Sequence, residues 1–157
     1  MQIKMLDGHE AFLADACTAA GIADTPQRRM IYRTLAESHD HPTAEVVHAR
    51  VREKLPRVSL ATVYRNLKLF AQAGIIDEVA TGRSYARYDA NRARHQHLVC
   101  KSCGGVSDFF SDALGDLALP GEEVDGFEVH DLKINLLGLC AVCREHGSER
   151  EPAVDQE

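Results

Sequence analysis

The sequence lacks any long run of apolar residues. A helix needs about 20 consecutive apolar residues to cross a bilayer, and the runs here are only a few residues long. The first 20 residues contain several acids and no clean apolar stretch, so they do not resemble a secretory signal. We therefore expect a cytoplasmic protein with no membrane segment, in a compartment that keeps thiols reduced.

The sequence also lacks the positive charge that is typical of proteins that bind nucleic acid, because its formal net charge is −6. The charge is unevenly distributed, however. Residues 1–88 contain 12 Lys and Arg against 10 Asp and Glu, whereas residues 89–157 contain 6 against 14. A net charge of +2 joined to one of −8 predicts two regions with different tasks. The small basic excess does not by itself indicate DNA binding.

Capping residues and apolar periodicity predict three helices in the first half. Thr25, Thr43 and Ser59 each stand where a side-chain oxygen would cap a helix, and Pro26 follows the first of them. Gly74 would end the third helix. The apolar residues expected on the buried faces are Met30, Ile31 and Leu35, then Val46, Val47 and Val51, then Leu60, Val63, Leu67 and Phe70.

The opposite face of the third predicted helix is polar. Ser59 caps it, and Thr62, Tyr64, Arg65 and Lys68 follow. Such a helix suits the major groove, because Arg can donate two hydrogen bonds to guanine while Thr and Tyr contact phosphates or a thymine methyl. Most surface helices have a polar face, so this feature alone does not predict DNA binding.

The next segment strengthens the DNA-binding interpretation. Residues 75–89, IIDEVATGRSYARYD, alternate apolar and polar residues around a Thr-Gly turn, which is typical of a two-stranded hairpin. Three helices and a hairpin predict a winged helix-turn-helix domain. Arg83 would lie at the tip of the wing, where it can reach the minor groove or the DNA backbone.

Four of the five cysteines form two equally spaced pairs, Cys100-x-x-Cys103 and Cys140-x-x-Cys143. Together they match the four ligands of a tetrahedral zinc ion. A thioredoxin-like redox pair is the alternative, but it needs a cysteine at a helix N-terminus, and a Gly-Gly pair and a strand-like segment follow Cys103. Four thiolates leave zinc no position for a substrate, so we predict a structural site. Cys17 is expected to be a buried residue of a short N-terminal helix.

Histidines and aspartates cluster as well. His95 and His97 alternate along an expected strand, so both rings would point to one face. Asp108 falls on the neighbouring strand, Asp89 at the end of the winged helix, and His41 just before the second helix. Taken alone, each of them is better explained as a surface, turn or loop residue.

Four motifs, HPTAEVV, SLATVYRNLKLFAQAGII, HQHLVCKSCG and CAVC, resemble the ferric uptake regulator (Fur) family in their order and spacing. The resemblance implies an α+β fold, with an N-terminal winged helix-turn-helix domain and a C-terminal α/β dimerisation domain. The DNA-binding domain would cover residues 1–88, the hinge 89–96, and the dimerisation and metal-binding domain 97–147. Residues 148–157 are acidic and nearly lack apolar side chains, so we expect a disordered tail.

The resemblance further implies a structural zinc at the four cysteines and a regulatory metal between the domains. Its ligands would be His41, Asp89, His95, His97 and Asp108. Three imidazoles and two carboxylates suit Fe(II) or Mn(II). Aspartate at both acidic positions is typical of the peroxide-sensing (PerR-like) branch, whereas the ferric uptake branch has glutamate there.

The resemblance to the peroxide-sensing branch implies a switch. Iron-catalysed oxidation would attack His41 or His95, the metal would leave, and the repressor would release its DNA. A manganese form would repress yet resist peroxide. An iron-responsive or a zinc-responsive (Zur) repressor without peroxide sensing is the alternative.

A third metal site of iron-sensing members is expected to be absent or reduced to a remnant. Arg94 and Gln96 stand where those members have a further His and Asp. Glu128 and His130 are the residues that would form such a remnant.

An enzyme is the alternative of a different class. The chain has no HExxH motif, and the HxE motif of zinc deaminases fails because the residue two after His95 is His97. We therefore predict a repressor and not an enzyme. The resemblance implies that it would bind palindromic double-stranded operator DNA as a homodimer, whose twofold symmetry would match two half-sites.

In the second half, strands are expected near residues 96–101, 105–110 and 126–138, with a helix around 111–119. The segment GFEVHDLKINLLGLC alternates like one long strand, which we expect to pair at the dimer interface.

Overall fold

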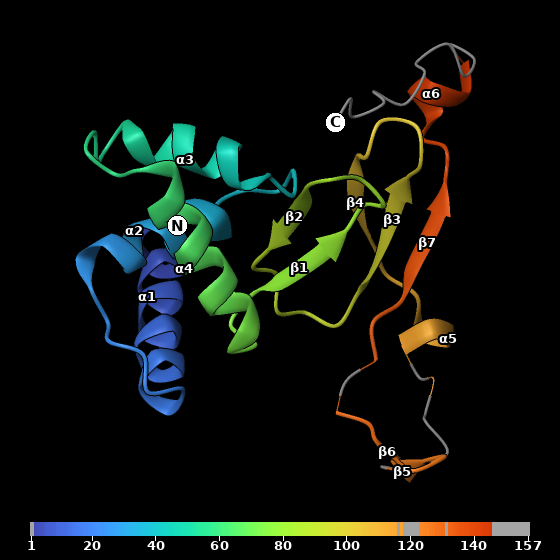
Figure 1. The fold of residues 1–157 in the computed structure, drawn as a ribbon, viewed down its shortest axis with the longest axis horizontal. Coiled ribbons are helices and arrows are strands. Elements are labelled where there is room, and N and C mark those ends of the chain that lie inside the picture. Colours follow the sequence, from blue (N-terminus) through green and yellow to red (C-terminus); the bar gives the residue numbers. More distant parts are fainter. Residues whose placement is uncertain (1, 116, 118–122, 131, 146–157) are drawn as a thin grey trace. The chain divides into compact units, whose positions relative to one another are not determined.

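The computed structural model describes residues 2–115, 117, 123–130 and 132–145. They form two compact units, Met1–Arg92 and Ala93–Glu157 (Figure 1). The α+β fold class expected from the sequence is confirmed. No helix in the described ranges combines the length and the apolar character needed to cross a bilayer. The predicted disordered tail, 148–157, lies outside the described residues.

The first unit contains four helices followed by a two-stranded hairpin (Figure 1). Its elements are α1 (Gln2–Ala19), α2 (Pro26–Ala36), α3 (Ala44–Arg52), α4 (Leu60–Gln72), β1 (Asp77–Ala80) and β2 (Ala86–Asp89). The predicted short N-terminal helix is in fact 18 residues long. Leu13 and Cys17 are buried one turn apart on α1, which shows how this helix joins the core.

The three predicted caps are present. The hydroxyl oxygens of Thr25, Thr43 and Ser59 each accept a hydrogen bond from the backbone N–H three residues later, over 3.3, 3.5 and 3.1 Å. After α4, Gly74 adopts a φ of +68°, a left-handed conformation that glycine tolerates without a steric penalty. Local chemistry therefore sets the ends of these helices.

The core of the first unit contains most of the predicted apolar residues, with one correction. Val46 is 37% exposed, so its predicted burial is wrong. The buried face of α3 consists of Ala44, Val47 and Val51, spaced by three and four residues, and Val46 lies to one side of that stripe. Predicted core residues that are only half-buried are Met30 and Leu60.

The wing is an antiparallel hairpin, with Asp77 opposite Asp89 and Ala80 opposite Ala86. Its loop turns at Gly82, whose φ is +71°. The Thr81 hydroxyl closes the loop by donating a hydrogen bond of 2.8 Å to the carbonyl oxygen of Tyr85. The pattern of residues 75–89 thus predicted the hairpin correctly.

The second unit is built on a three-stranded sheet in which β3 (Gln96–Cys100) lies between β4 (Val106–Phe109) and β7 (Asn135–Gly138) (Figure 1). β3 pairs antiparallel with β4 and parallel with β7. The remaining elements are α5 (Asp112–Gly115), β5 (Glu123–Val124), β6 (Phe127–Glu128) and α6 (Ala141–Glu145).

The predicted single strand over 126–138 is wrong. Asp125 and Gly126, with φ of +50° and +82°, form a turn that pairs β5 with β6, and a separate strand, β7, pairs with β3. A strand persists only where a neighbour satisfies its backbone groups, and the described residues between β6 and β7 have no such neighbour within the sheet pairings. Alternation alone does not reveal this interruption.

The predicted helix over 111–119 is also shorter than expected. α5 ends at Gly115, and Leu117 is irregular. Glycine is a poor helix former, which explains an end at this position. The other residues expected in the last turn, 116, 118 and 119, lie outside the described ranges.

Candidate metal centres and DNA-binding helix

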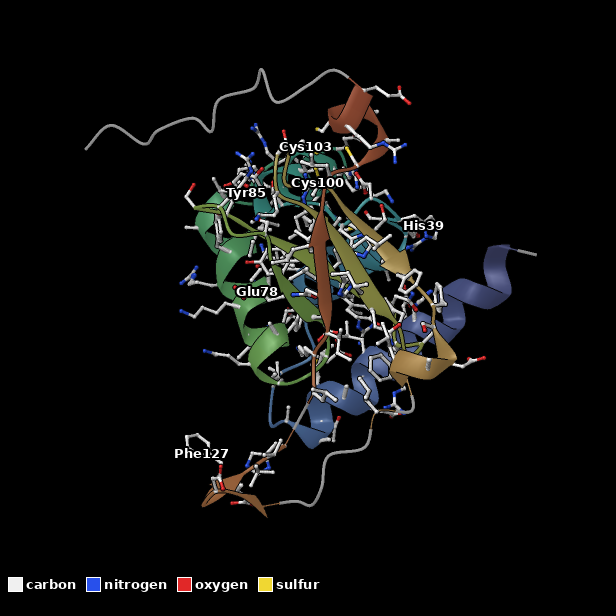
Figure 2. All side chains as sticks on the ribbon, turned by 90° about the vertical axis from the view of Figure 1, so that its right-hand side faces the viewer. His39, Glu78, Tyr85, Cys100, Cys103 and Phe127 are labelled. Carbon is white, nitrogen blue, oxygen red and sulfur yellow. The ribbon has the colours of Figure 1, made fainter. Side chains whose placement is uncertain are left out.

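The four paired cysteines meet at one end of the second unit. Cys100 ends β3 and Cys103 follows three residues later (Figure 2), while Cys140 directly precedes α6 and Cys143 lies on it. One sulfur from each cysteine lies within 4.8 Å of the others, and the Sγ atoms of Cys103 and Cys140 are 3.9 Å apart. Four sulfurs at this spacing match a tetrahedral zinc site.

Backbone N–H groups point at these sulfurs. The N–H of Cys140 donates to Sγ of Cys100 over 3.3 Å, and that of Gly105 donates to Sγ of Cys103 over 3.4 Å. A Cβ on Gly105 would lie 3.2 Å from Sγ of Cys103, a tight contact, so a residue without a side chain suits this position. Such N–H groups favour thiolates, the form that binds zinc.

The acidity of the thiols has the same origin. Burial alone raises the pKa of the Cys100 thiol, but hydrogen bonds from the backbone of Cys103, Cys140 and Ser102 outweigh it and lower the pKa to about 6. For Cys143, a hydrogen bond with Ser102 lowers the pKa, but its thiol neighbours raise it to about 11. The pKa values of these two neighbouring thiols thus shift in opposite directions, and a divalent cation among the sulfurs would favour the thiolate form of both.

Two of the expected regulatory ligands lie in the first unit. His41 and Asp89 are both buried, and Nε2 of His41 is 3.6 Å from Oδ2 of Asp89. His41 stands in the loop before α3, and Asp89 is the last residue of β2. An imidazole and a carboxylate are the ligand types of a mixed nitrogen and oxygen site.

The other three expected ligands lie in the second unit, on two neighbouring strands or directly before one of them. His97 pairs with Asp108 across β3 and β4, and His95 precedes β3. Nε2 of His95 lies 3.0 Å from Nε2 of His97 and 3.4 Å from Oδ1 of Asp108. The prediction that His95 and His97 share a face therefore agrees with the structure.

The tautomer of His95 suits metal binding. Its Nδ1 lies 2.6 Å from the carbonyl oxygen of Ala93, so Nδ1 must contribute the proton of that hydrogen bond. Nε2 is then the ring nitrogen that faces His97 and Asp108. A hydrogen bond from the second ring nitrogen is the usual way in which proteins orient a histidine ligand.

Glu128 and His130 do not form a preorganised metal site. Oε1 of Glu128 and Nε2 of His130 are 4.0 Å apart, and their side chains are 82% and 77% exposed. Nearby Phe127 is also exposed, and Figure 2 shows it on the β5–β6 hairpin. An exposed pair at this distance gives no support to a remnant metal site.

The polar face of α4 is largely open to solvent. Tyr64, Arg65 and Lys68 are exposed, Ser59 is exposed at the N-cap, and Thr62 is half-buried. Arg83, half-buried, follows Gly82 in the wing loop. All six predicted DNA contacts thus belong to α4, its cap or the wing.

Sequence reasoning missed a partner of this face. The hydroxyl of Tyr64 donates a hydrogen bond to Oε1 of Glu45 on α3. This contact lowers the pKa of the Glu45 carboxyl and, on the other side, raises that of the Tyr64 hydroxyl. The two residues are 19 positions apart in the sequence, so no local pattern could have indicated their contact.

Comparison with known proteins gives a consistent result. The sequence model of the ferric uptake regulator family matches residues 19–137. The peroxide-responsive repressor PerR of Staphylococcus epidermidis (strain ATCC 12228 / FDA PCI 1200) is 37% identical over 129 residues, which cover 82% of this chain and 86% of the relative. PerR of Staphylococcus aureus (strain Mu50 / ATCC 700699) is 36% identical over 126 residues, or 80% of this chain and 85% of the relative.

Two solved structures show the same fold. A zinc-bound manganese uptake regulator is 33% identical, with a TM-score of 0.59 over 82% of this chain and 98% of its own. A ferric uptake regulator from Pseudomonas aeruginosa with manganese is 29% identical, with a TM-score of 0.65 over 82% and 97%. Since the family match covers most of the sequence, this chain belongs to the ferric uptake regulator family.

Proposed function

We propose that the chain is a metal-dependent, DNA-binding transcriptional repressor that senses peroxide through oxidation of His41 or His95. The observation that supports it most is the set of ligands, two in the first unit and three in the second, with aspartate at both acidic positions. The names of its relatives in Staphylococcus, which are peroxide-responsive repressors, point the same way.

The cysteine cluster would hold a structural Zn(II). Its four sulfurs occupy every position of a tetrahedral ion, so it would link β3 to β7 and α6 without taking part in the response. In a unit with a small apolar core, a bound zinc would supply much of the stability.

The histidine and aspartate ligands would hold the regulatory Fe(II) or Mn(II). Bound Fe(II) would supply the chemistry that turns peroxide into an oxidant of a neighbouring imidazole. His41 and His95 would receive the oxygen, and an oxidised ring is a poorer ligand than a neutral imidazole. Ligands from both units sharing one ion would also restrict the hinge around residues 89–96. Loss of a ligand would therefore free the hinge.

A restricted hinge matters if two copies bind one duplex. α4 would enter the major groove through Thr62, Tyr64, Arg65 and Lys68, with Ser59 and Arg83 near the backbone or minor groove. With metal bound, two winged helices in fixed orientation would match the half-sites of a palindrome. Without it, DNA binding would carry the additional cost of ordering the hinge.

The proposed homodimer would form through the second unit. Among the described strands, β7 lies at the edge of its sheet, and Leu137 on it and Leu139 just after it are 64% and 54% exposed. Exposed apolar side chains on an unpaired edge are typical of interfaces. Such a repressor would act on DNA in the cytoplasm, as a regulator and not as an enzyme.

The test uses the zinc-loaded full-length protein without oxygen. A duplex is first enriched from a randomised library with the Mn(II)-loaded protein, and its affinity is then measured with Fe(II) or Mn(II), before and after a peroxide pulse. We expect the Fe(II) form to lose affinity and to gain one oxygen on the peptide of His41 or His95. The Mn(II) form should lose neither.

The alternatives predict different results. An iron-responsive or zinc-responsive repressor would show metal-dependent DNA binding that survives the pulse with no added oxygen. Failure to enrich any duplex in the presence of metal would contradict the repressor function altogether.

A further inference from the structure

His41 adopts a backbone conformation that needs support. Its φ is +46°, in the left-handed region that residues with a side chain rarely occupy. The next residue, Pro42, is restricted as well, and the loop ends at the cap of α3. A residue held in such a conformation persists only where its surroundings fix it, and this occurs most often at functional sites.

Arg87 of β2 supplies that support. Its Nη1 donates a hydrogen bond of 2.8 Å to the carbonyl oxygen of His41 and a longer one, 3.4 Å, to that of Asp40. The next residue on the strand, Tyr88, donates its backbone N–H to the carbonyl oxygen of Pro42 over 3.1 Å. Three successive carbonyl groups of the loop therefore bind to β2.

The same strand also contains Asp89. Residues two apart on a strand point to the same side, so Arg87 and Asp89 lie on one side of β2. Arg87 holds the backbone of His41, while the Asp89 carboxylate lies 3.6 Å from its ring. One strand, β2, thus contains Asp89 and also holds the backbone of His41 in place.

A second arginine holds the other side of the loop. Arg50 of α3 donates to both carboxylate oxygens of Asp40, over 2.9 and 2.7 Å, and to the hydroxyl of Ser38 over 2.8 Å. The side chains of Arg50 and Asp40 are 38% and 56% exposed. Exposed ion pairs contribute little, so Arg87, which binds the His41 carbonyl directly, is the more important of the two.

From this geometry we propose that Arg87 is a positioning residue for the regulatory metal: it holds the His41 loop so that His41 and Asp89 are ready to bind the ion together. The inference rests on the proposed function, since it takes His41 and Asp89 to be ligands. It extends that function by assigning a role to Arg87, which is not itself a proposed ligand. Arg87 lies on β2, the strand of the wing that also contains Asp89.

The direction in which the metal affinity changes when Arg87 is replaced distinguishes a positioning role from a purely electrostatic one. Arg87 is cationic, so its removal lowers the electrostatic repulsion of a divalent cation nearby, and charge alone predicts tighter metal binding. Loss of positioning predicts weaker binding, because the loop must be ordered when the metal binds. The two explanations give opposite results for the same variant.

The experiment measures the Mn(II) dissociation constant of the zinc-loaded, full-length protein by titration, for Arg87→Ala, Arg87→Lys, Arg52→Ala and His41→Ala. Arg52, an exposed residue at the end of α3, is the matched control for the loss of one positive charge. Zinc content and thermal unfolding are recorded for each variant. Arg87→Lys keeps the charge and serves if Arg87→Ala does not fold.

We expect Arg87→Ala to weaken Mn(II) binding about tenfold, the lower end of what the loss of an outer-shell partner costs. Arg87→Lys should weaken it less, since lysine keeps one donor but loses the planar fork. Arg52→Ala should bind Mn(II) as the wild type does. At saturating Mn(II), Arg87→Ala should recover the wild-type affinity for the enriched duplex.

Unchanged or tighter Mn(II) binding by both Arg87 variants would overturn the inference. DNA affinity that stays low at saturating Mn(II) would overturn it too, because the defect would then lie in the wing itself. His41→Ala distinguishes this failure from that of the proposed function. If His41→Ala binds Mn(II) normally, His41 is not a ligand and the proposed regulatory site is wrong.

Discussion

The cysteine cluster and the histidine and aspartate ligands differ in how the chain supplies them. All four cysteines belong to one compact unit and lie around one strand end and a short helix, where backbone N–H groups point at the sulfurs. The five proposed regulatory ligands are divided between the two units. A metal held within one unit would stabilise that unit, whereas a metal that took ligands from two units would restrict their relative orientation. The proposed zinc would therefore stabilise one unit, and the proposed regulatory metal would act on both.

The largest effect is expected from Cys143→Ser. Removing one thiolate should abolish tight zinc binding and with it the cooperative unfolding of the second unit, because structural zinc contributes about 10–16 kcal/mol in small zinc domains. Zinc content and hydrogen exchange of the second unit are the measurements. Cys17→Ala, a buried cysteine outside the cluster, is the control and should keep its zinc. Full zinc content in Cys143→Ser would contradict the structural site.

His97→Ala should lose Mn(II) binding and keep its zinc. We expect it to lose Mn(II) affinity by more than the roughly 100-fold that an outer-shell change can cost, while zinc content and the unfolding of the second unit stay close to wild type. Parallel titrations with Mn(II) and zinc analysis test this. A variant that loses zinc together with Mn(II) would show that the two sites are not independent.

Arg65→Ala should affect neither metal. It should weaken binding to the enriched duplex by about 1–3 kcal/mol, the range for an arginine that contacts a base. Competition binding at saturating Mn(II) measures this effect. The exposed Arg57, which lies before the cap of α4, provides an Arg57→Ala control of equal charge. Equal losses in the two variants would indicate a general effect of charge and not a contact from α4.

Thr25→Ala should have the smallest effect. Loss of the cap of α2 should destabilise the first unit by about 1 kcal/mol and leave both metal contents unchanged. Thr25→Ser, which keeps the hydroxyl, should retain most of the stability. Denaturant unfolding of the zinc-loaded protein measures the difference. A change in Mn(II) affinity would mean that the first-unit ligands depend on α2 more than the structure indicates.

Local signals in the sequence were sufficient for much of the fold. The caps Thr25, Thr43 and Ser59 and the wing turn at Gly82 depend on neighbouring residues only, so their patterns predicted them correctly. The cysteine pairs were found in the same way, because the two members of each pair are only three positions apart.

Contacts between distant residues could not be predicted. Arg87 and His41 are 46 positions apart, and nothing in either segment indicates a hydrogen bond between them. The strand expected over 126–138 failed for a related reason, since its interruption depends on which strands are available as partners. The sequence could not show that Asp108 lies opposite His97 either, because that contact depends on the pairing of β4 with β3.

The central claim is that one divalent ion, shared by ligands from both units, sets the affinity for DNA. The most direct measurement is the affinity for the enriched duplex as a function of Mn(II), for the zinc-loaded wild type and for a variant with alanine at His41, Asp89 and His97. We predict a metal-dependent rise in affinity that the variant has lost while its zinc remains bound. A variant that binds the duplex as tightly as the wild type in excess Mn(II) would contradict the claim.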